Sequence, residues 1–155
     1  MTERTIGILG GMGPEATVEL FRRIIALTPA KRDQDHLHVL IDSNPKIPDR
    51  TAAIRGQGES PLPLLIAAAK NLERAGADFI IIPCNTAHHW LHELREIISI
   101  PIIDMIGQTA ERVASQQSSA QWIGLLSTEG TLRSGLYQNA FASRGIALLV
   151  PNDQQ

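Results

Sequence analysis

Short apolar runs alternate with longer stretches of helical period along this chain of 155 residues. Four such runs, TIGILGG, LHVLIDS, DFIIIP and PIIDMI, predict strands at residues 5–11, 37–43, 78–83 and 101–106. The stretches between them have the apolar spacing of helices, at 14–28, 61–77 and 85–98. Strand–helix units in succession are typical of an α/β fold. We therefore predict a parallel four-stranded sheet flanked by helices, in an N-terminal domain of residues 1–106.

Single residues mark where two of these helices begin and end. Pro14 suits the first position of the helix at 14–28, which carries Val18, Phe21 and Ile25 on one face. Gly76 is expected to end the helix at 61–77. Residues 44–60 contain several prolines and glycines and predict a long loop, which is either functional or disordered.

A second strand–turn–helix phrase begins after residue 120. IGLLSTEG at 123–130 has the same order of apolar residues and glycines as IGILGGMG at 6–13, and a helical stretch follows it. One interpretation is that α/β proteins reuse such phrases, and the other is that a second copy of the first unit starts here. Under the second interpretation, residues 107–155 comprise a linker helix and a partial second α/β domain.

Composition and charge exclude several classes of function. Hydrophobic residues make up 43% and charged residues 19%, which is typical of a globular protein. The net charge is -2 and no basic block occurs, so we expect no nucleic-acid partner. No apolar run approaches the roughly 20 residues that span a bilayer, so we expect no membrane partner. The N-terminus lacks a signal-peptide layout and the single cysteine cannot form an internal disulfide, which predicts a cytoplasmic protein.

That cysteine, Cys84, directly follows the third predicted strand. Ligands of parallel α/β sheets bind beyond the carboxyl ends of the strands. Asn85 or Thr86 can cap the helix that follows, and the partial positive charge at a helix N-terminus favours a thiolate. A cysteine often serves only as a small hydrophobic residue, but the polar NTAH behind this one favours a base or nucleophile.

The glycine turn GGMGP ends the first predicted strand at the same edge of the sheet. Gly10, Gly11 and Gly13 allow backbone N–H groups to converge on an anion such as a carboxylate or phosphate. GMGPEA also satisfies a weak dinucleotide-binding pattern. The acidic residue that this pattern needs has three loose candidates, Asp33, Asp35 and Asp42. We do not favour a nucleotide site because it leaves the cysteine unexplained.

Two arginines lie in the long loop. A guanidinium there could bind a substrate carboxylate through two hydrogen bonds. Arg50 is the better candidate because it belongs to the tight phrase NPKIPDR, whereas Arg55 is more typical of a solvated loop charge.

Three histidines follow the cysteine, and two of them, His88 and His92, lie four residues apart on one face of the predicted helix. The rest of a zinc-binding pattern is absent from the sequence, since there is no HExxH and no acid or second cysteine at ligand spacing. We therefore expect no metal and interpret His88, His89 and His92 as surface or packing residues. His88 is close enough to Cys84 to tune it.

Taken in order, the phrases GILGGMGPEAT, NPKIPDR, PCNTAH, PIIDMI and LLSTEGT resemble the aspartate/glutamate racemase family of cofactor-independent, cysteine-dependent enzymes. The resemblance implies two α/β domains related by a pseudo-twofold axis, with the active site between them. It also implies that one thiolate removes the α-proton of an acidic amino acid and an opposite thiol reprotonates the other face. No cofactor takes part in that reaction.

The resemblance also implies roles for individual residues. Cys84 matches the first catalytic cysteine. Asn85 and Thr86 match positions that bind a substrate carboxylate, and Arg50 matches the arginine for the side-chain carboxylate.

Two further turns match the family, and the chain departs from it after them. Met12 and Gly13 match the glycine-turn wall of the pocket, and Thr128 and Thr131 match second-domain residues near the substrate. The family's second cysteine and a later lysine have no counterpart in this chain. We therefore expect an incomplete racemase that is inactive by itself.

Other functions stay open at this point. A one-thiol relative resembling maleate isomerase or a decarboxylase would need Cys84 alone, and a non-catalytic fragment would bind dicarboxylates or a partner chain. Two strands rarely hold together without cover. We therefore expect a homo-oligomer, such as a dimer, that forms through residues from about 120 onward, or loose order in that segment.

Overall fold

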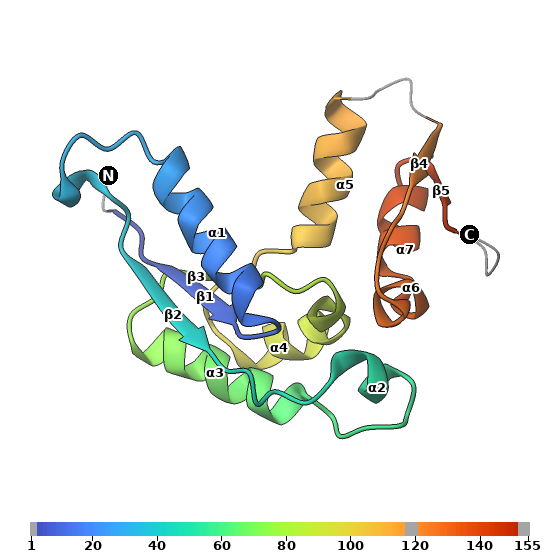
Figure 1. The fold of residues 1–155 in the computed structure, drawn as a ribbon, viewed down its shortest axis with the longest axis horizontal. Helices are drawn as coiled ribbons and strands as arrows, with labels where there is room; N and C mark the ends of the chain where they lie inside the picture. The colour runs from blue at the N-terminus through green and yellow to red at the C-terminus, as the bar shows by residue number, and fades with distance from the viewer. Residues whose placement is uncertain (1–2, 117–120, 152–155) are drawn as a thin grey trace.

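The computed structural model describes residues 3–116 and 121–151. Three parallel strands form the first sheet in the order β2-β1-β3: β1 (Ile6–Gly10), β2 (Val39–Ser43) and β3 (Phe79–Ile81). The central strand β1 is buried along its whole length, as expected of a strand with neighbours on both sides. Because the strands are parallel, the turns that follow them meet at one edge of the sheet (Figure 1).

The predicted fourth strand is reduced to one parallel bridge, between Ile80 and Ile102. The segment bonds to Ile80 through the carbonyl of Pro101 and the amide of Ile103, and Pro101 has no N–H with which to extend the ladder. The chain then turns at Asp104 into α5 (Met105–Gln116). The prediction of a four-stranded sheet was therefore wrong by one strand.

Helices cover the two faces of this sheet unequally (Figure 1). On one face lie α3 (Leu62–Arg74) and α4 (Leu91–Ile97), and the core between them and the sheet includes the fully buried Leu9, Leu65, Ile80 and Leu94. Gly76, with φ +94°, follows the end of α3 as predicted.

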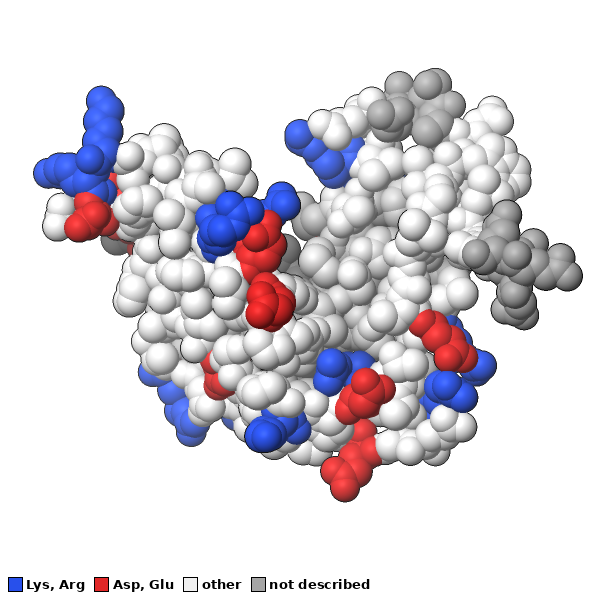
Figure 2. Space-filling view, viewed as in Figure 1, with Lys and Arg blue, Asp and Glu red and all other residues white. Residues whose placement is uncertain are grey.

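The opposite face carries α1 (Pro14–Leu27), which begins at Pro14 as predicted. Val18 and Ile25 are 61% and 44% exposed. The helix turns Leu20 instead toward an apolar groove of about 440 Å³ that it shares with the strand ends and α5. Figure 2 shows the molecule hollowed between these two helices.

The long loop after β2 is ordered and partly helical. It contains α2 (Arg50–Ile54), which begins where the Asp49 carboxylate accepts a 2.6 Å hydrogen bond from the amide of Ala52. The alternative of a disordered loop is therefore wrong. Before β2 lies a short 3₁₀ helix, η1 (Asp33–Asp35).

The second sheet has two parallel strands, β4 (Trp122–Gly124) and β5 (Ala147–Leu149). Between them the chain forms α6 (Glu129–Ser134) and α7 (Leu136–Ala142). The sequence predicted one helix here, but Gly135 adopts a left-handed conformation with φ +68° and divides it. Helices α5 and α7 cover the inner face of the sheet around the buried Ala110, Phe141 and Ile146.

No helix among the described residues is both long and apolar enough to cross a bilayer. Lys and Arg side chains are dispersed among Asp and Glu on the face shown in Figure 2.

Candidate active site

Turns from both sheets line one cavity of about 260 Å³. Its walls come from the glycine turn, the loop after β2, and the turns after β3 and β4. The residues for which the family resemblance implied a role line it, except Gly13: Met12, Arg50, Cys84, Asn85, Thr86, Thr128 and Thr131. Gly13 instead occupies the N-cap position of α1, one residue beyond Met12.

Cys84 lies partly buried at the end of the first sheet, in the turn after β3. The segment that follows is a 3₁₀ helix, η2 (Thr86–Trp90), and α4 begins only at Leu91. The predicted cap is wrong, because Asn85 occupies the N-cap position without a capping hydrogen bond and Thr86 lies inside η2. A five-residue 3₁₀ helix also has little of the aligned dipole on which the argument for a thiolate rested.

The side chain of Thr86 bonds to the second unit instead. Its hydroxyl lies 2.8 Å from the hydroxyl of Thr131 and 3.1 Å from that of Thr128, and these two lie 3.1 Å apart. Thr128 also caps α6 by accepting from the amide of Thr131. Each hydroxyl can donate one bond and accept another, so the three form a closed ring. This ring joins the turn that holds Cys84 to the turn after β4.

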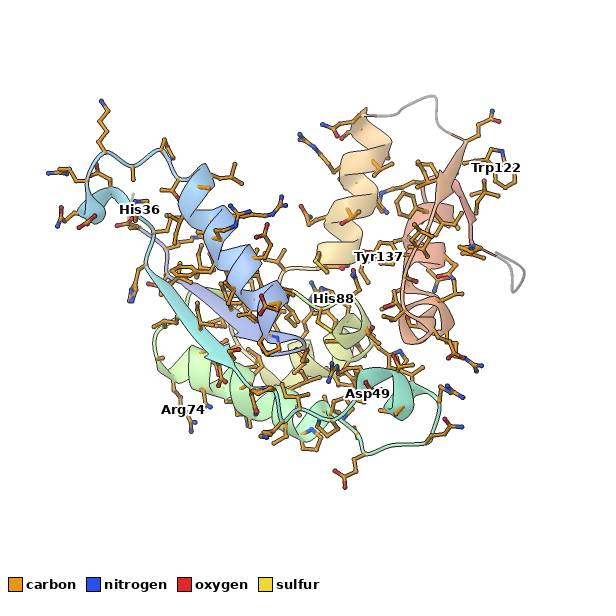
Figure 3. All side chains as sticks on the ribbon, viewed as in Figure 1. His36, Asp49, Arg74, His88, Trp122 and Tyr137 are labelled. Carbon is orange, nitrogen blue, oxygen red and sulfur yellow. The ribbon has the colours of Figure 1, made fainter. Side chains whose placement is uncertain are left out.

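The side chain of Asn85 is held by a residue that the sequence did not single out. The phenol of Tyr137, on α7, donates a 2.6 Å hydrogen bond to Oδ1 of Asn85. Burial raises the pKa of Tyr137 above its usual value, which keeps the phenol protonated as a donor. Since Oδ1 accepts this bond, the NH₂ group of Asn85 is left to donate to a ligand. Figure 3 shows Tyr137 on the side of α7 that faces α5.

The two arginines of the long loop behave differently. Arg50 lines the cavity, and its Nη1 donates to the carbonyls of Ile47 and Pro48 at 3.0 and 2.8 Å. Its Nε is buried and has no partner within the described residues. Arg55 does not line the cavity and forms a half-exposed ion pair with Glu129 at 3.2 Å. The geometry therefore favours Arg50 as the partner of a carboxylate.

The glycine turn contributes less to anion binding than its composition suggested. The amide of Gly11 donates to the hydroxyl of Thr17 at 2.9 Å, so this N–H is not available to a ligand. A Cβ at Gly10 would collide with the same Thr17 side chain, which explains the glycine. Of the acids considered for a nucleotide, Asp35 is bound by Arg32 and Asp42 accepts from Asn71.

The three histidines line one pocket, but their side chains have different partners. His88 is 2% exposed, and its two ring nitrogens lie within hydrogen-bonding distance of the carbonyl of Cys84 and the amide of Met105. His92 is largely exposed and lies 3.4 Å from Glu96, and His89 meets Trp90 edge to face. Within residues 3–116 and 121–151, no three side chains of His, Cys, Asp or Glu gather as metal ligands would.

Several residues in and beside the cavity were not selected from the sequence. Asp49, Thr51, Pro83 and Ser127 complete the lining beside residues that were selected. Tyr137 lies in the middle of a helical stretch, so its contact with Asn85 depends on how the second unit packs. Asp49, Pro83 and Ser127 belong to the phrases NPKIPDR, PCNTAH and STEGT, and Thr51 follows the first of them, so membership in these phrases is the signal that could have found them.

The sequence of this chain matches a known family over most of its length. Residues 9–155 match the profile of the family described as Asp/Glu/Hydantoin racemase. The broad specificity amino-acid racemase RacX of Bacillus subtilis is 32% identical over 146 residues, which cover 90% of this chain and 61% of RacX. A glutamate racemase of Corynebacterium diphtheriae is 38% identical over 81 residues, which cover 52% of this chain and 30% of that protein.

Solved structures agree with this assignment. An aspartate racemase of Picrophilus torridus superimposes with a TM-score of 0.86 and 35% identity, over 97% of this chain and 64% of that one. A glutamate racemase of Francisella tularensis, solved with D-glutamate, has the same fold at 21% identity and a TM-score of 0.71, over 97% of this chain and 53% of that one. The chain thus spans less than two thirds of each of these relatives. It belongs to the Asp/Glu/hydantoin racemase family.

Proposed function

We propose that this chain carries one thiol base of a cofactor-independent racemase of acidic amino acids. The observation that carries the proposal is that Cys84, Arg50 and Asn85 line one cavity of about 260 Å³. A thiol can serve as a base, a guanidinium can pair with a carboxylate, and an amide NH₂ can donate to a second carboxylate. Relatives named aspartate and glutamate racemases support an acidic substrate.

In the proposed reaction, Arg50 binds the side-chain carboxylate, and Asn85 and Thr86 bind the α-carboxylate. The thiolate of Cys84 takes the α-proton, and the negative charge spreads onto the α-carboxylate. Hydrogen-bond donors already aimed at that group stabilise the charge as it develops. Cys84 can return a proton only to the face from which it took one, and the chain holds no other cysteine. We therefore propose that it does not racemise by itself.

The proposed enzyme has two domains. Residues 1–106 form the domain that carries Cys84, and residues 107–155 belong to a second domain related to it by a pseudo-twofold repeat. Two strand–turn–helix phrases support the repeat, β1 followed by α1 and β4 followed by α6. A single thiol stays reduced in the cytoplasm, where we place the protein.

We also propose that the chain self-associates through the second sheet. Trp122 and Leu149 are 61% and 56% exposed, and Trp122 projects from the outer side of β4 in Figure 3. Light scattering should show a dimer or larger species that Trp122→Lys shifts toward monomer. Val18→Lys is the matched control, because Val18 is also 61% exposed but lies on α1. A wild-type monomer would contradict this part of the proposal.

Protection of the single thiol tests the substrate class directly. Bound substrate should shield Cys84 from iodoacetamide, which mass spectrometry can follow without interference from other cysteines. We expect protection by aspartate or glutamate and little by alanine, which lacks the side-chain carboxylate. Equal protection by alanine, or none by either acid, would contradict an acidic substrate.

The same samples separate the alternatives. Conversion of maleate to fumarate that requires Cys84 would favour a one-thiol isomerase. Protection by dicarboxylates without any proton exchange at the α-carbon would favour a binding fragment.

A further inference from the structure

The imidazole ring of His88 links Cys84, which carries the thiol of the candidate site, to the start of α5. Nδ1 lies 2.8 Å from the carbonyl oxygen of Cys84, and Nε2 lies 3.2 Å from the amide nitrogen of Met105. A carbonyl oxygen only accepts and an amide N–H only donates. The ring must therefore carry its proton on Nδ1 and leave Nε2 free to accept. Its two partners together select one neutral tautomer.

The surroundings of the ring favour the same neutral form. Burial lowers the pKa of His88 below its usual value. This outweighs the opposing effects of the hydrogen bond to the Cys84 carbonyl, the Asp104 carboxylate and the backbone of Ile103. The Arg95 guanidinium acts in the same direction as burial. The imidazoles of His89 and His92 line the same pocket as His88. Protonation at Nε2 would set two N–H groups against each other at Met105, so a charged ring would break this link.

The two partners of His88 belong to different parts of the fold. Cys84 follows β3, and Met105 is the first residue of α5, the helix that leads toward the second sheet. Asn85, the residue after Cys84, is held by Tyr137 on α7. Helices α5 and α7 pack against each other around Ala110 and Phe141. Adjacent residues of one turn are thus fastened separately to two helices that form one packed unit.

We propose that His88 is a positioning residue, which sets the place of the Cys84 thiol relative to α5 by holding the Cys84 carbonyl. His88 does not line the 260 Å³ cavity, so it acts through the backbone and not on a ligand. The functional meaning of this inference rests on the proposed role of Cys84. Its test needs no turnover, so the two can fail independently.

The tautomer is tested first, in the wild-type chain. A long-range ¹H–¹⁵N spectrum at pH 7 should show His88 with Nδ1 protonated and Nε2 unprotonated. A proton on Nε2, in either a neutral or a charged ring, would overturn the inference because Met105 could not then donate.

Variants test whether the link positions the thiol. His88→Gln keeps one donor and one acceptor about as far apart as the ring nitrogens, whereas His88→Ala removes both. A lost hydrogen bond is worth about two- to tenfold in an equilibrium. We therefore expect the Met105 amide to exchange with solvent about two- to tenfold faster in His88→Ala, and alkylation of Cys84 by iodoacetamide to quicken by a similar factor. His88→Gln should restore both rates in part. His89→Ala, at the exposed neighbour, should change neither.

Two outcomes would overturn the positioning role. Faster exchange at Met105 with an unchanged alkylation rate of Cys84 would overturn the positioning role, since the link would then not reach the thiol. An equal effect of Gln and Ala would also overturn it, because packing and not hydrogen bonding would be responsible. If His88→Ala does not fold, the wild-type tautomer and the His88→Gln rates still decide the matter.

Discussion

The phenol oxygen of Tyr137 lies 2.6 Å from Oδ1 of Asn85 and so joins α7 to the turn that holds Cys84. The residues are 52 positions apart in the sequence, and the contact is side chain to side chain. It shows that the second unit, although its sheet has two strands, reaches the cavity and orients a residue in it.

Removing this one hydroxyl should weaken ligand binding more than it weakens the fold. Tyr137→Phe keeps the ring that stacks on Phe141, at a centroid distance of 6.4 Å, and leaves the Asn85 amide free to rotate. We expect aspartate or glutamate to bind about two- to tenfold more weakly, the value of one hydrogen bond. Titration calorimetry measures this directly. Unchanged affinity would show that the Asn85 amide does not need Tyr137 to hold it.

The two loop arginines provide a matched pair. A charged hydrogen bond to a carboxylate is worth about 1.5–3 kcal/mol. Arg50→Ala should therefore weaken the binding of aspartate or glutamate about tenfold or more. Arg55→Ala loses only the half-exposed pair with Glu129 and should have a small effect. Equal losses of affinity from the two substitutions would refute the assignment of Arg50.

The contact between α2 and α6 depends on a glycine. A Cβ at Gly130 would lie 2.5 Å from Oγ1 and 2.9 Å from Cα of Thr51, so α6 could not approach the loop as closely. Gly130→Ala should lower the free energy of unfolding by about 1–3 kcal/mol, as overpacking does. Gly124→Ala is the control, because nothing lies within 4 Å of a Cβ there. Denaturant unfolding of both variants checks this, and equal stabilities would contradict the close approach.

Much of the first unit could be predicted because its signals are local. Pro14 begins α1, a glycine follows the end of α3, and the apolar runs at β1, β2 and β3 form parallel strands. The fourth run failed for a reason that is also local. Pro101 cannot donate to a ladder and the chain turns at Asp104, which leaves room for one bridge only.

The side chains of the cavity bond to partners that lie far away in the sequence. Cys84 and the glycine turn could be chosen from phrases at strand ends, because parallel strands bring those ends together. Met12, Thr128 and Thr131 could be chosen only through the resemblance to the racemase family. The hydrogen-bond partners of the cavity side chains could not be predicted. Asn85 and Thr86 have the composition of helix caps, but Tyr137 and Thr131 engage them from the second unit. These partners depend on tertiary packing, which periodicity does not encode.

The burial of His88 predicts a pH dependence of stability. Its pKa is lowered from the ordinary value of 6.5, so the folded chain binds this proton less tightly than the unfolded chain does. The stability contributed by the neutral ring is complete above about pH 6.5 and is lost as pH falls through the lowered pKa.

Urea unfolding of the wild type and of His88→Gln between pH 7.5 and pH 5 isolates this contribution. Contributions that the two proteins share cancel in the difference. The free energy of unfolding should fall more steeply in the wild type as the solution is acidified. If the free energy of unfolding falls equally with pH in the two proteins, the fold does not hold His88 neutral.

The central claim is that Cys84 acts as a base toward the α-carbon of an acidic amino acid. Its most direct test is proton NMR of L- and D-aspartate and glutamate with the purified chain in D₂O, beside Cys84→Ala. One thiol that exchanges its own proton with solvent should place deuterium at the α-carbon of one enantiomer without inverting it. We expect such exchange in the wild type, none in Cys84→Ala, and no racemisation in either. Exchange that persists in Cys84→Ala, or full racemisation by the wild-type chain, would contradict this expectation.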